Sequence, residues 1–405
     1  MGVGGASEKY RLGERIGGGG MAEVFEAVLV GAEGFARPVA VKRMIPTLSI
    51  DPAFGQMFVN EARIASLLHH ANIGAVLDFD RDAEGRYFIV MELIRGLDLR
   101  RLADGGRLPV GSAVHIVTEM LRGLDYAHEL EHEGRRLGVV HRDISPHNVM
   151  LSWDGAVKVV DFGIAKVLAA TGVSRTGTIK GKLAYMSPEQ AGAAELDGRS
   201  DLFSVGVVLH ELLTGQRLFR GQTEPEVLAR LLTQPIPRPS EIAPDVPAEL
   251  DRVVMWLLER DREARAPSAH DALDALLGTS AASTRGALEL QRVLTERFPD
   301  KAPKRRGGSS AASQSGSGGA TPSPVTPATP TAITQISPVE ATVPQTPAAR
   351  AARTQVAAAA PTLTARPAAA VEAPAAAVPS RPAGRRRPWM AGAVVAAVAA
   401  AVTAG

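Results

Sequence analysis

The spacing of hydrophobic and polar positions along the chain changes near residue 110. Between residues 10 and 100, Val, Ile and aromatic side chains recur at nearly every second position and glycines separate the runs, which is typical of short β-strands. The predicted strands are Tyr10–Ile16, Glu23–Val30, Pro38–Arg43 and Tyr87–Leu93. Phe54–Leu68 has apolar residues at helical spacing and predicts one helix among the strands.

From residue 110 to residue 280 the apolar positions follow a helical period. The predicted helices are Val110–Ala127, Ser200–Thr214, Glu224–Leu232, Pro247–Glu259 and Ala269–Leu277. The sequence therefore predicts an α+β fold, in which a small β-rich lobe precedes a larger helical lobe.

The composition changes after about residue 300, where Ala, Pro, Ser, Thr and Gly dominate. Such a segment cannot bury enough apolar surface to offset the entropy lost on ordering. We therefore expect a flexible N-terminus at residues 1–9 and a folded domain at residues 10–280. A mostly disordered extension is expected at residues 281–384.

The final stretch combines a basic cluster with an uncharged run. Arg385, Arg386, Arg387 and Trp389 precede Met390–Gly405, which has no charged residue. Arginines and a tryptophan beside an apolar run are typical of the inner membrane interface. Residues 385–405 are thus predicted to begin a membrane anchor, with the folded domain in the cytoplasm. The alternative is a disordered Ala-rich tail, because the run is short and weakly hydrophobic.

Charge and cysteine content narrow the function classes. Residues 301–405 contain 11 Lys/Arg and 2 Asp/Glu, whereas residues 1–300 contain 34 and 41. The positive charge therefore belongs to the tail, and no basic stripe with aromatic residues suggests nucleic-acid binding. The chain has no cysteine, which excludes disulfides and thiolate metal sites.

Three local signals in the β-rich part are weak when each is taken alone. Gly17–Gly20 lies between two predicted strands, where glycines allow backbone N–H groups to approach phosphate oxygens. Lys42 ends a Val-Ala-Val-Lys strand, and Glu61 lies on the predicted helix. Ordinary explanations are a turn, a strand-edge charge and a solvated helix residue.

Three further motifs follow in order and are much more specific together. They are His141–Asn148 with the sequence HRDISPHN, Asp161–Gly163 with the sequence DFG, and Met186–Glu189 with the sequence MSPE. On these motifs the chain resembles the eukaryotic-like (Hanks-type) Ser/Thr protein kinases of bacteria, over about residues 10–280. The resemblance implies a bilobal kinase fold and transfer of the γ-phosphoryl group of ATP to protein Ser/Thr hydroxyls. The alternative is a pseudokinase that acts as a signalling scaffold.

The resemblance also implies roles for individual residues. Asp143 is similar to the catalytic base, Lys42 and Glu61 to the phosphate-binding ion pair, and Asn148 and Asp161 to the Mg²⁺ ligands, with Mn²⁺ as a possible substitute. ATP binding is expected at Ile16, Gly17, Gly18, Gly19, Gly20, Val24, Ala40, Lys42, Met91, Glu92, Ile94 and Met150. Structural roles are expected for Arg142, Glu189, Asp201 and Arg265. The expected partners are ATP, protein substrates and, through the C-terminal segment, a membrane.

The chain departs from the family pattern at three positions near the expected chemistry. Ala22 replaces the third glycine of the phosphate loop, which a residue with negative φ tolerates. Many relatives have a lysine two residues after the catalytic aspartate and a threonine before the Pro-Glu motif, where this chain has Ser145 and Lys182. We predict that Lys182 supplies the ammonium near the γ-phosphate and Ser145 the hydroxyl near Asp143. The alternative is that Lys182 is a surface charge and catalysis is impaired.

Two further motifs bear on regulation and on an alternative chemistry. In kinases with an arginine such as Arg142, phosphate on the activation segment commonly docks there, and the acceptors here are Thr171, Ser174, Thr176 and Thr178. Thr176, with Ser174 and Thr178 as neighbours, is the favoured site. Separately, His128–His132 reads HELEH and satisfies the HExxH zinc motif, which keeps a zinc hydrolase as a minor alternative.

Overall fold

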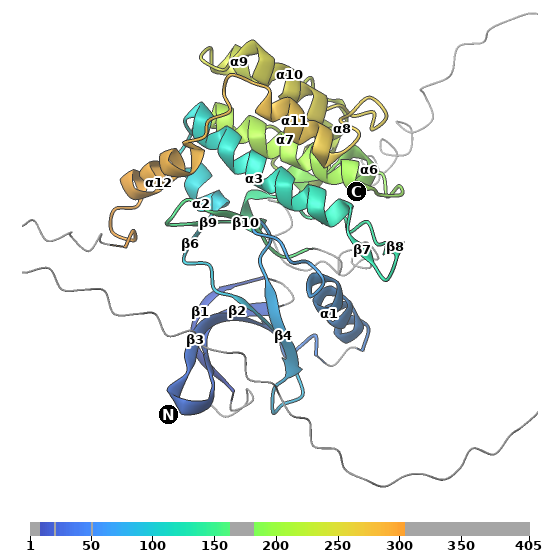
Figure 1. The fold of residues 1–405 in the computed structure, drawn as a ribbon. Helices are drawn as coiled ribbons and strands as arrows, with labels where there is room; N and C mark the ends of the chain where they lie inside the picture. Colours follow the sequence, from blue (N-terminus) through green and yellow to red (C-terminus); the bar gives the residue numbers. More distant parts are fainter. Residues whose placement is uncertain (1–8, 20–21, 50–51, 163–181, 304–405) are drawn as a thin grey trace, which may run out of the picture. The chain divides into compact units, whose positions relative to one another are not determined.

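The computed structural model describes residues 9–19, 22–49, 52–162 and 182–303 of the 405-residue chain. These residues form two lobes, a β-sheet lobe and a helical lobe, which lie at the bottom and top of Figure 1. The α+β arrangement expected from the change in periodicity is confirmed.

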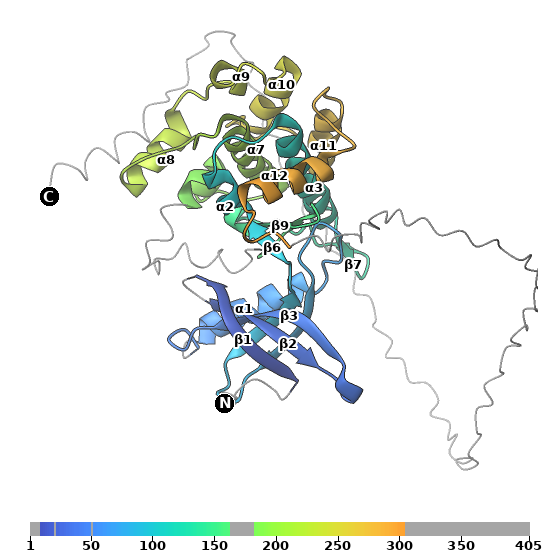
Figure 2. The same cartoon turned by 90° about the vertical axis from the view of Figure 1, so that its left-hand side faces the viewer.

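The smaller lobe is built on a five-stranded antiparallel sheet with the order β1-β2-β3-β5-β4. Its strands are β1 (Tyr10–Gly18), β2 (Ala22–Val30), β3 (Ala36–Met44), β4 (Val76–Arg81) and β5 (Tyr87–Glu92). The helix α1 (Pro52–Ala65) crosses the sheet (Figure 2), and its Phe58 and Ala62 pack with Met44 and Ile89. β4 was not predicted, because its sequence carries three charged residues among six.

The larger lobe is a group of helices around α7 (Gly198–Thr214), which is buried at every residue from Ser200 to Thr214. α3 (Val110–His128), α10 (Ala248–Leu257) and α11 (Ala269–Leu277) pack against it (Figure 1). The remaining helices are α2 (Leu99–Asp104), α6 (Pro188–Ala191), α8 (Glu224–Thr233), α9 (Pro239–Ile242) and α12 (Gly286–Arg297).

Short strands and 3₁₀ turns join the two lobes and carry the motifs. β6 (Gly96–Asp98), β9 (Val149–Ser152) and β10 (Val157–Val159) form a three-stranded sheet with β9 at its centre. The 3₁₀ turn Pro146–Asn148 lies directly before β9, so the HRDISPHN motif is held at the end of this sheet.

The HExxH residues do not form a zinc site. α3 ends at His128, and His132 lies on the exposed hairpin of β7 (Glu131–His132) and β8 (Arg135–Arg136). His128 is buried and its Nε2–H donates to Asp201 over 2.9 Å, so it faces the core. No cluster of three or more His, Cys, Asp or Glu suited to a metal occurs in the described part of the chain. The zinc-hydrolase alternative is therefore wrong for this motif.

The folded region continues beyond the predicted boundary at residue 280. α12 packs on α3 and buries Leu290 and Leu294 completely. Arg297 then donates hydrogen bonds to the carbonyls of Leu102 and Gly106 over 2.9 and 3.1 Å, at the C-terminal end of α2. Leu102 O also accepts the Gly105 amide at the end of α2, so α12 reinforces this helix end as well as covering apolar surface.

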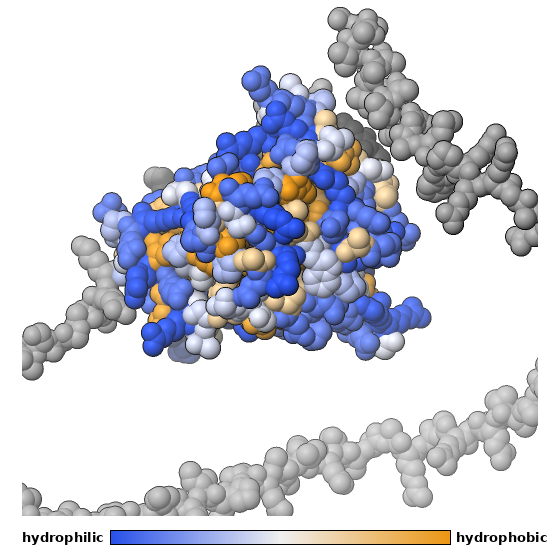
Figure 3. Space-filling model, turned by 90° about the horizontal axis from the view of Figure 1, so that it is seen from above, coloured by the Kyte–Doolittle hydropathy of each residue, from blue (hydrophilic) through white to orange (hydrophobic). Residues whose placement is uncertain are grey.

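The outer face of the helical lobe is largely hydrophilic, with apolar side chains visible in a band between polar ridges (Figure 3). Across residues 9–303, apart from the gaps noted above, no helix is long and apolar enough to span a bilayer. The predicted anchor at residues 385–405 and the predicted linker from residue 304 onward lie outside the described residues.

Candidate active site

A cleft of about 1160 Å³ runs along the junction of the two lobes. Of the residues predicted to bind ATP, those that line this cleft are Ile16, Gly17, Val24, Ala40, Lys42, Met91, Glu92, Ile94 and Met150. Gly18 and Gly19 belong to the same turn but are not part of the lining, and Gly20 lies outside the described residues. Ala22 does not have a positive φ, as expected for its replacement of a glycine.

Lys42 joins two carboxylates at the inner end of the cleft. Its Nζ lies 2.7 Å from Glu61 Oε1 on α1 and 2.9 Å from Asp161 Oδ1. Burial alone lowers the pKa of Lys42, but the negative charges of Asp161 and Glu61 outweigh it and raise the net pKa well above the usual value. Lys42 is therefore a fixed positive charge at any physiological pH.

The segment that follows β5 presents its main chain to the cleft. The carboxylate of Glu92 accepts hydrogen bonds from Lys158 Nζ and the Ala75 amide, each over 2.8 Å. Its side chain is thus already satisfied within the protein. Hydrogen bonds between residues 92–94 and a base in the cleft would therefore be made by backbone N–H and C=O groups. Lys301 and Pro303, which follow α12, complete the outer rim of the same cleft.

The catalytic-loop residues converge around Asp143. Asn148 Nδ2 donates to Asp143 O and Oδ2, both over 2.8 Å, and Lys182 Nζ lies 2.7 Å from the same Oδ2. Lys182 is the first described residue after the gap at residues 163–181, and it reaches the catalytic loop. Ser145 behaves differently: its hydroxyl is buried without a hydrogen-bond partner among the described groups, so it does not bond Asp143.

Asp201 on α7 fixes the backbone of this loop from below. Its Oδ2 and Oδ1 accept the amides of His141 and Arg142, each over 2.8 Å. Arg142 consequently has a φ of 65°, which a non-glycine residue adopts only when its surroundings impose it. Asp201 is the residue that sequence reasoning assigned to this support.

His141 links the loop to the segment containing Asp161. Its Nδ1 accepts the Asp143 amide over 3.2 Å, so its Nε2 carries the proton and donates to Val160 O over 3.0 Å. Burial lowers the pKa of His141, which keeps this neutral tautomer in place. The imidazole also contacts the ring of Phe162, with centroids 4.6 Å apart. Asp161, at φ 58°, is thereby turned toward Lys42.

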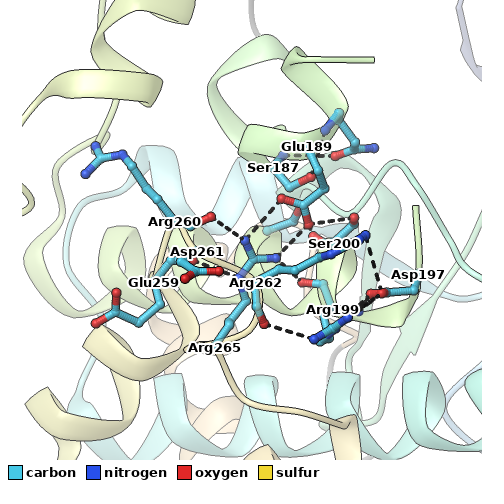
Figure 4. A network of polar contacts seen from close by, with 12 residues as sticks. Ser187, Glu189, Asp197, Arg199, Ser200, Glu259, Arg260, Asp261, Arg262 and Arg265 are labelled. Carbon is cyan, nitrogen blue, oxygen red and sulfur yellow. Dashed lines mark hydrogen bonds and ion pairs between the residues drawn. The ribbon is translucent and has the colours of Figure 1, made fainter. Parts of the chain in front are cut away.

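Glu189 and Arg265, for which structural roles are expected, form a bidentate and buried pair (Figure 4). The two nitrogen–oxygen distances are 2.7 and 3.1 Å, and the Arg265 side chain is 0% exposed. Arg265 also donates to the carbonyls of Glu259 and Arg199, and Ser200 donates to Glu189 (Figure 4). Burial raises the pKa of Glu189, but the hydrogen bonds from Arg265 and Ser200 outweigh it and the net pKa is lowered.

The metal ligands expected from the sequence fit a hard cation. Both N–H groups of the Asn148 amide are used by Asp143, so its oxygen is the atom left to coordinate a cation. The Asp161 side chain is 40% exposed and uses Oδ1 for Lys42. Burial raises and Lys42 lowers the pKa of Asp161, with a lowered pKa as the result, so it is ionised. Amide and carboxylate oxygens of this kind suit Mg²⁺, with water and phosphate oxygens completing its coordination.

Sequence reasoning missed a second buried ion pair near the catalytic loop. Arg100 on α2 donates to Glu211 Oε1 on α7 over 2.6 Å, and Tyr185 also donates to Glu211. Burial raises the pKa of the Tyr185 hydroxyl, which keeps it a donor. The residues of the pair are 111 positions apart, and no local pattern marks them.

The predicted phosphorylation sites Thr171, Ser174, Thr176 and Thr178 lie outside the described residues.

Comparison with known proteins agrees with this geometry. The tyrosine-protein kinase MasK of Myxococcus xanthus is 42% identical over 306 residues, covering 72% of this chain and 47% of that protein. The serine/threonine-protein kinase PknB of Mycobacterium leprae is 38% identical over 265 residues, covering 64% and 41%. The chain thus spans less than half the length of these relatives.

The fold has close counterparts among solved structures. The Mycobacterium tuberculosis PknI kinase domain is 28% identical, with a TM-score of 0.51, and the match covers 68% of this chain and 96% of that one. The family model described as "Protein kinase domain" matches residues 10–276. Together with the converging Lys42, Asp143 and Asp161, these matches show that the chain belongs to the protein kinase domain family.

Proposed function

We propose that the chain is an active Ser/Thr protein kinase that uses Mg-ATP. The observation that supports it most is that Lys42 and Asp161 are paired in the lining of the cleft, while His141 bonds both the Asp143 amide and Val160 O. It thereby ties the loop containing Asp143 and Asn148 to the segment containing Asp161. A pseudokinase scaffold would not need Asp143, Asn148 and Asp161 to be present and oriented together. All three are, which favours catalysis over a scaffold.

The chain's own groups support a direct transfer. The substrate hydroxyl oxygen forms a bond to the γ-phosphorus, the bond from that phosphorus to the bridging oxygen breaks, and ADP leaves with that electron pair. The hydroxyl proton passes to the Asp143 carboxylate. Lys42 balances charge on the nucleotide phosphates, and a bound Mg²⁺ supplies further charge neutralisation at Asn148 and Asp161. Positioning and charge stabilisation carry most of the catalysis in such reactions.

Phosphate transfer by the full 405-residue chain tests this proposal directly. After incubation with Mg-ATP and a general protein substrate, intact mass spectrometry should show additions in multiples of one phosphate. Acid hydrolysis should then release phosphoserine and phosphothreonine. Release of phosphotyrosine alone would instead identify tyrosine as the acceptor, as the name of the relative MasK indicates for that protein. No incorporation in the presence of Mg²⁺ or Mn²⁺ would favour the scaffold.

We also propose that Lys182 is a catalytic residue that holds Asp143 and reaches the transferred phosphate. Its Nζ contacts Asp143 and its side chain is 26% exposed, so the same ammonium can face the nucleotide. Lys182→Met should lower kcat by about a hundredfold, the usual effect of removing one charge-stabilising donor. Lys182→Arg should retain more activity than Lys182→Met, since it keeps the charge. Steady-state phosphorylation kinetics measure both.

A rescue variant distinguishes a catalytic ammonium from a structural one. Ser145 is a buried residue of the catalytic loop, two positions after Asp143, so Ser145→Lys in a Lys182→Thr chain restores a lysine to the neighbourhood of Asp143. Partial recovery of kcat is expected. Near-normal kcat in Lys182→Met would refute the assignment.

We also propose that phosphate on the activation segment docks on Arg142, and that residues 385–405 tether the chain to a membrane. The buried Nε of Arg142 has no hydrogen-bond partner among the described residues, which supports docking of a phosphate from the activation segment. Membrane tethering through residues 385–405 is supported only by the arginines and tryptophan before the apolar run.

A further inference from the structure

A second pocket, of about 660 Å³, opens beside the catalytic loop in the helical lobe. It lies between α2, the C-terminal end of α7 and the start of α8. The residues that matter for its chemistry are Arg100, Asp104, Glu211, Arg217, Arg220 and Phe219. We name it the arginine pocket. Five of these six side chains are ionisable. The charge of the partner that the arginine pocket binds therefore depends on which of them are not already paired within the protein.

The two carboxylates of the arginine pocket are already engaged. Arg100 donates to Glu211 over 2.6 Å and also forms an ion pair with Asp104. Glu211 is further occupied by the Tyr185 hydroxyl, and its side chain is only 5% exposed. A cationic partner at Glu211 would therefore have to displace a buried ion pair, which is strongly unfavourable. Asp104 has a side chain that is 63% exposed, and it is already paired with Arg100.

The two remaining arginines are unmatched. Arg217 and Arg220 are exposed, and neither forms an ion pair with any residue that the structure describes. Residues 163–181, which lie outside the described part of the chain, contain no carboxylate either, since their ionisable residues are Lys166, Arg175 and Lys180. The pocket therefore carries a net positive charge that calls for an anion from outside the described fold.

The arginine pocket lies close to the reacting groups. α2 packs on the 3₁₀ turn Pro146–Asn148, and α8 packs on the turn Leu183–Tyr185 that follows Lys182. A substrate segment bound near Asp143 can therefore present an anion to the arginine pocket while its hydroxyl reacts.

We propose that the arginine pocket binds an acidic side chain of the protein substrate, close in sequence to the phosphorylated hydroxyl, and that Arg217 and Arg220 determine this specificity. The inference rests on the proposed kinase function. Guanidinium groups pair well with carboxylates, and such a pair forms only in the enzyme–substrate complex.

Peptides with one serine and a single variable residue test the inference. Glu, Gln or Lys is placed in turn at each nearby position, and kcat/KM is measured with the full chain. At one or two positions Glu should exceed Gln by about tenfold, the effect of one charge-assisted contact, and Lys should fall below Gln. Arg217→Glu and Arg220→Glu should each remove or reverse this preference while leaving kcat/KM for the Gln peptide within about threefold.

Arg37→Glu is the matched control, because Arg37 is an exposed residue on β3 in the other lobe (Figure 1) and the change in charge is the same. It should leave the peptide preference unchanged. An active enzyme without any preference for Glu, or with a preference that survives both pocket variants, overturns the inference but not the proposed function.

Two other outcomes would show either that the arginine pocket has a different occupant or that the chain does not transfer phosphate. If the pocket variants reduce turnover of all peptides equally and abolish any gain from autophosphorylation, the occupant is the phosphorylated activation segment and the inference fails. If the chain transfers no phosphate to itself or to any peptide, the proposed function fails first and the inference fails with it.

Discussion

Asp143→Asn should reduce kcat for phosphate transfer by about a thousandfold, within the range for loss of a positioned general base. The amide keeps the shape of the side chain, and the main-chain bond from Asn148 remains. The amide side chain of the variant cannot accept the proton of the substrate hydroxyl, however, and it has no negative charge to balance that of Lys182. The loss should therefore appear in kcat, with nucleotide affinity nearly unchanged, as measured by steady-state kinetics and calorimetric titration with Mg-ATP.

Asp274→Asn provides the control for that measurement. Asp274 lies on α11 with a side chain that is 67% exposed, so the same chemical change should leave kcat unaltered. If Asp143→Asn transferred phosphate within about tenfold of the unchanged chain, Asp143 would not be the base that general acid–base catalysis requires.

Arg265→Leu should lower the free energy of unfolding by about 3–5 kcal/mol, because it leaves a buried carboxylate without its partner. The Glu189 side chain is only 8% exposed, and Arg265 supplies two of its hydrogen bonds. Urea unfolding at neutral pH measures the loss. The double variant Glu189→Leu and Arg265→Leu should recover part of it, since no uncompensated charge remains.

The loss of unfolding free energy caused by Arg265→Leu should also become smaller as the pH falls. Arg265 and Ser200 hold the native pKa of Glu189 below its unfolded value, so their contribution is present above about pH 4.3 and is lost as the pH falls toward the native pKa. The stability difference between Arg265→Leu and the unchanged chain should therefore shrink on acidification. Arg262→Leu, at a neighbour whose side chain is 36% exposed, should lose no more than about 1 kcal/mol; an equal loss in both variants would contradict the argument.

The reactive centre was predictable because its chemistry restricts the residue types. A lysine, an Asp-Phe-Gly segment and a loop containing Asp143 and Asn148 have few alternative explanations when they occur in order. The position of Lys182 was also predictable, since the Ser145 substitution left a charge to be supplied from elsewhere. The expected hydrogen-bonding role of Ser145 was not found, because its hydroxyl is buried without a partner.

Long-range pairs and the end of the fold were not predictable in the same way. Arg100 and Glu211 are 111 residues apart, and each alone looks like a solvated helix charge. For α12 a signal did exist, since Leu290, Val293 and Leu294 have helical spacing and are all buried. It was overlooked because charged residues surround it and the resemblance to known kinases stopped near residue 280.

The rim formed by Lys301 and Pro303 has a thermodynamic consequence for whatever continues from it. Binding of a nucleotide that touches Lys301 and Pro303 is thermodynamically linked to any restraint placed on these two residues from outside the cleft. If tethering or a partner held this segment in a way that changed nucleotide affinity by a given factor, nucleotide would alter the affinity for that restraint by the same factor. Under that condition, occupancy of the cleft by nucleotide would be coupled to whatever restrains Lys301 and Pro303.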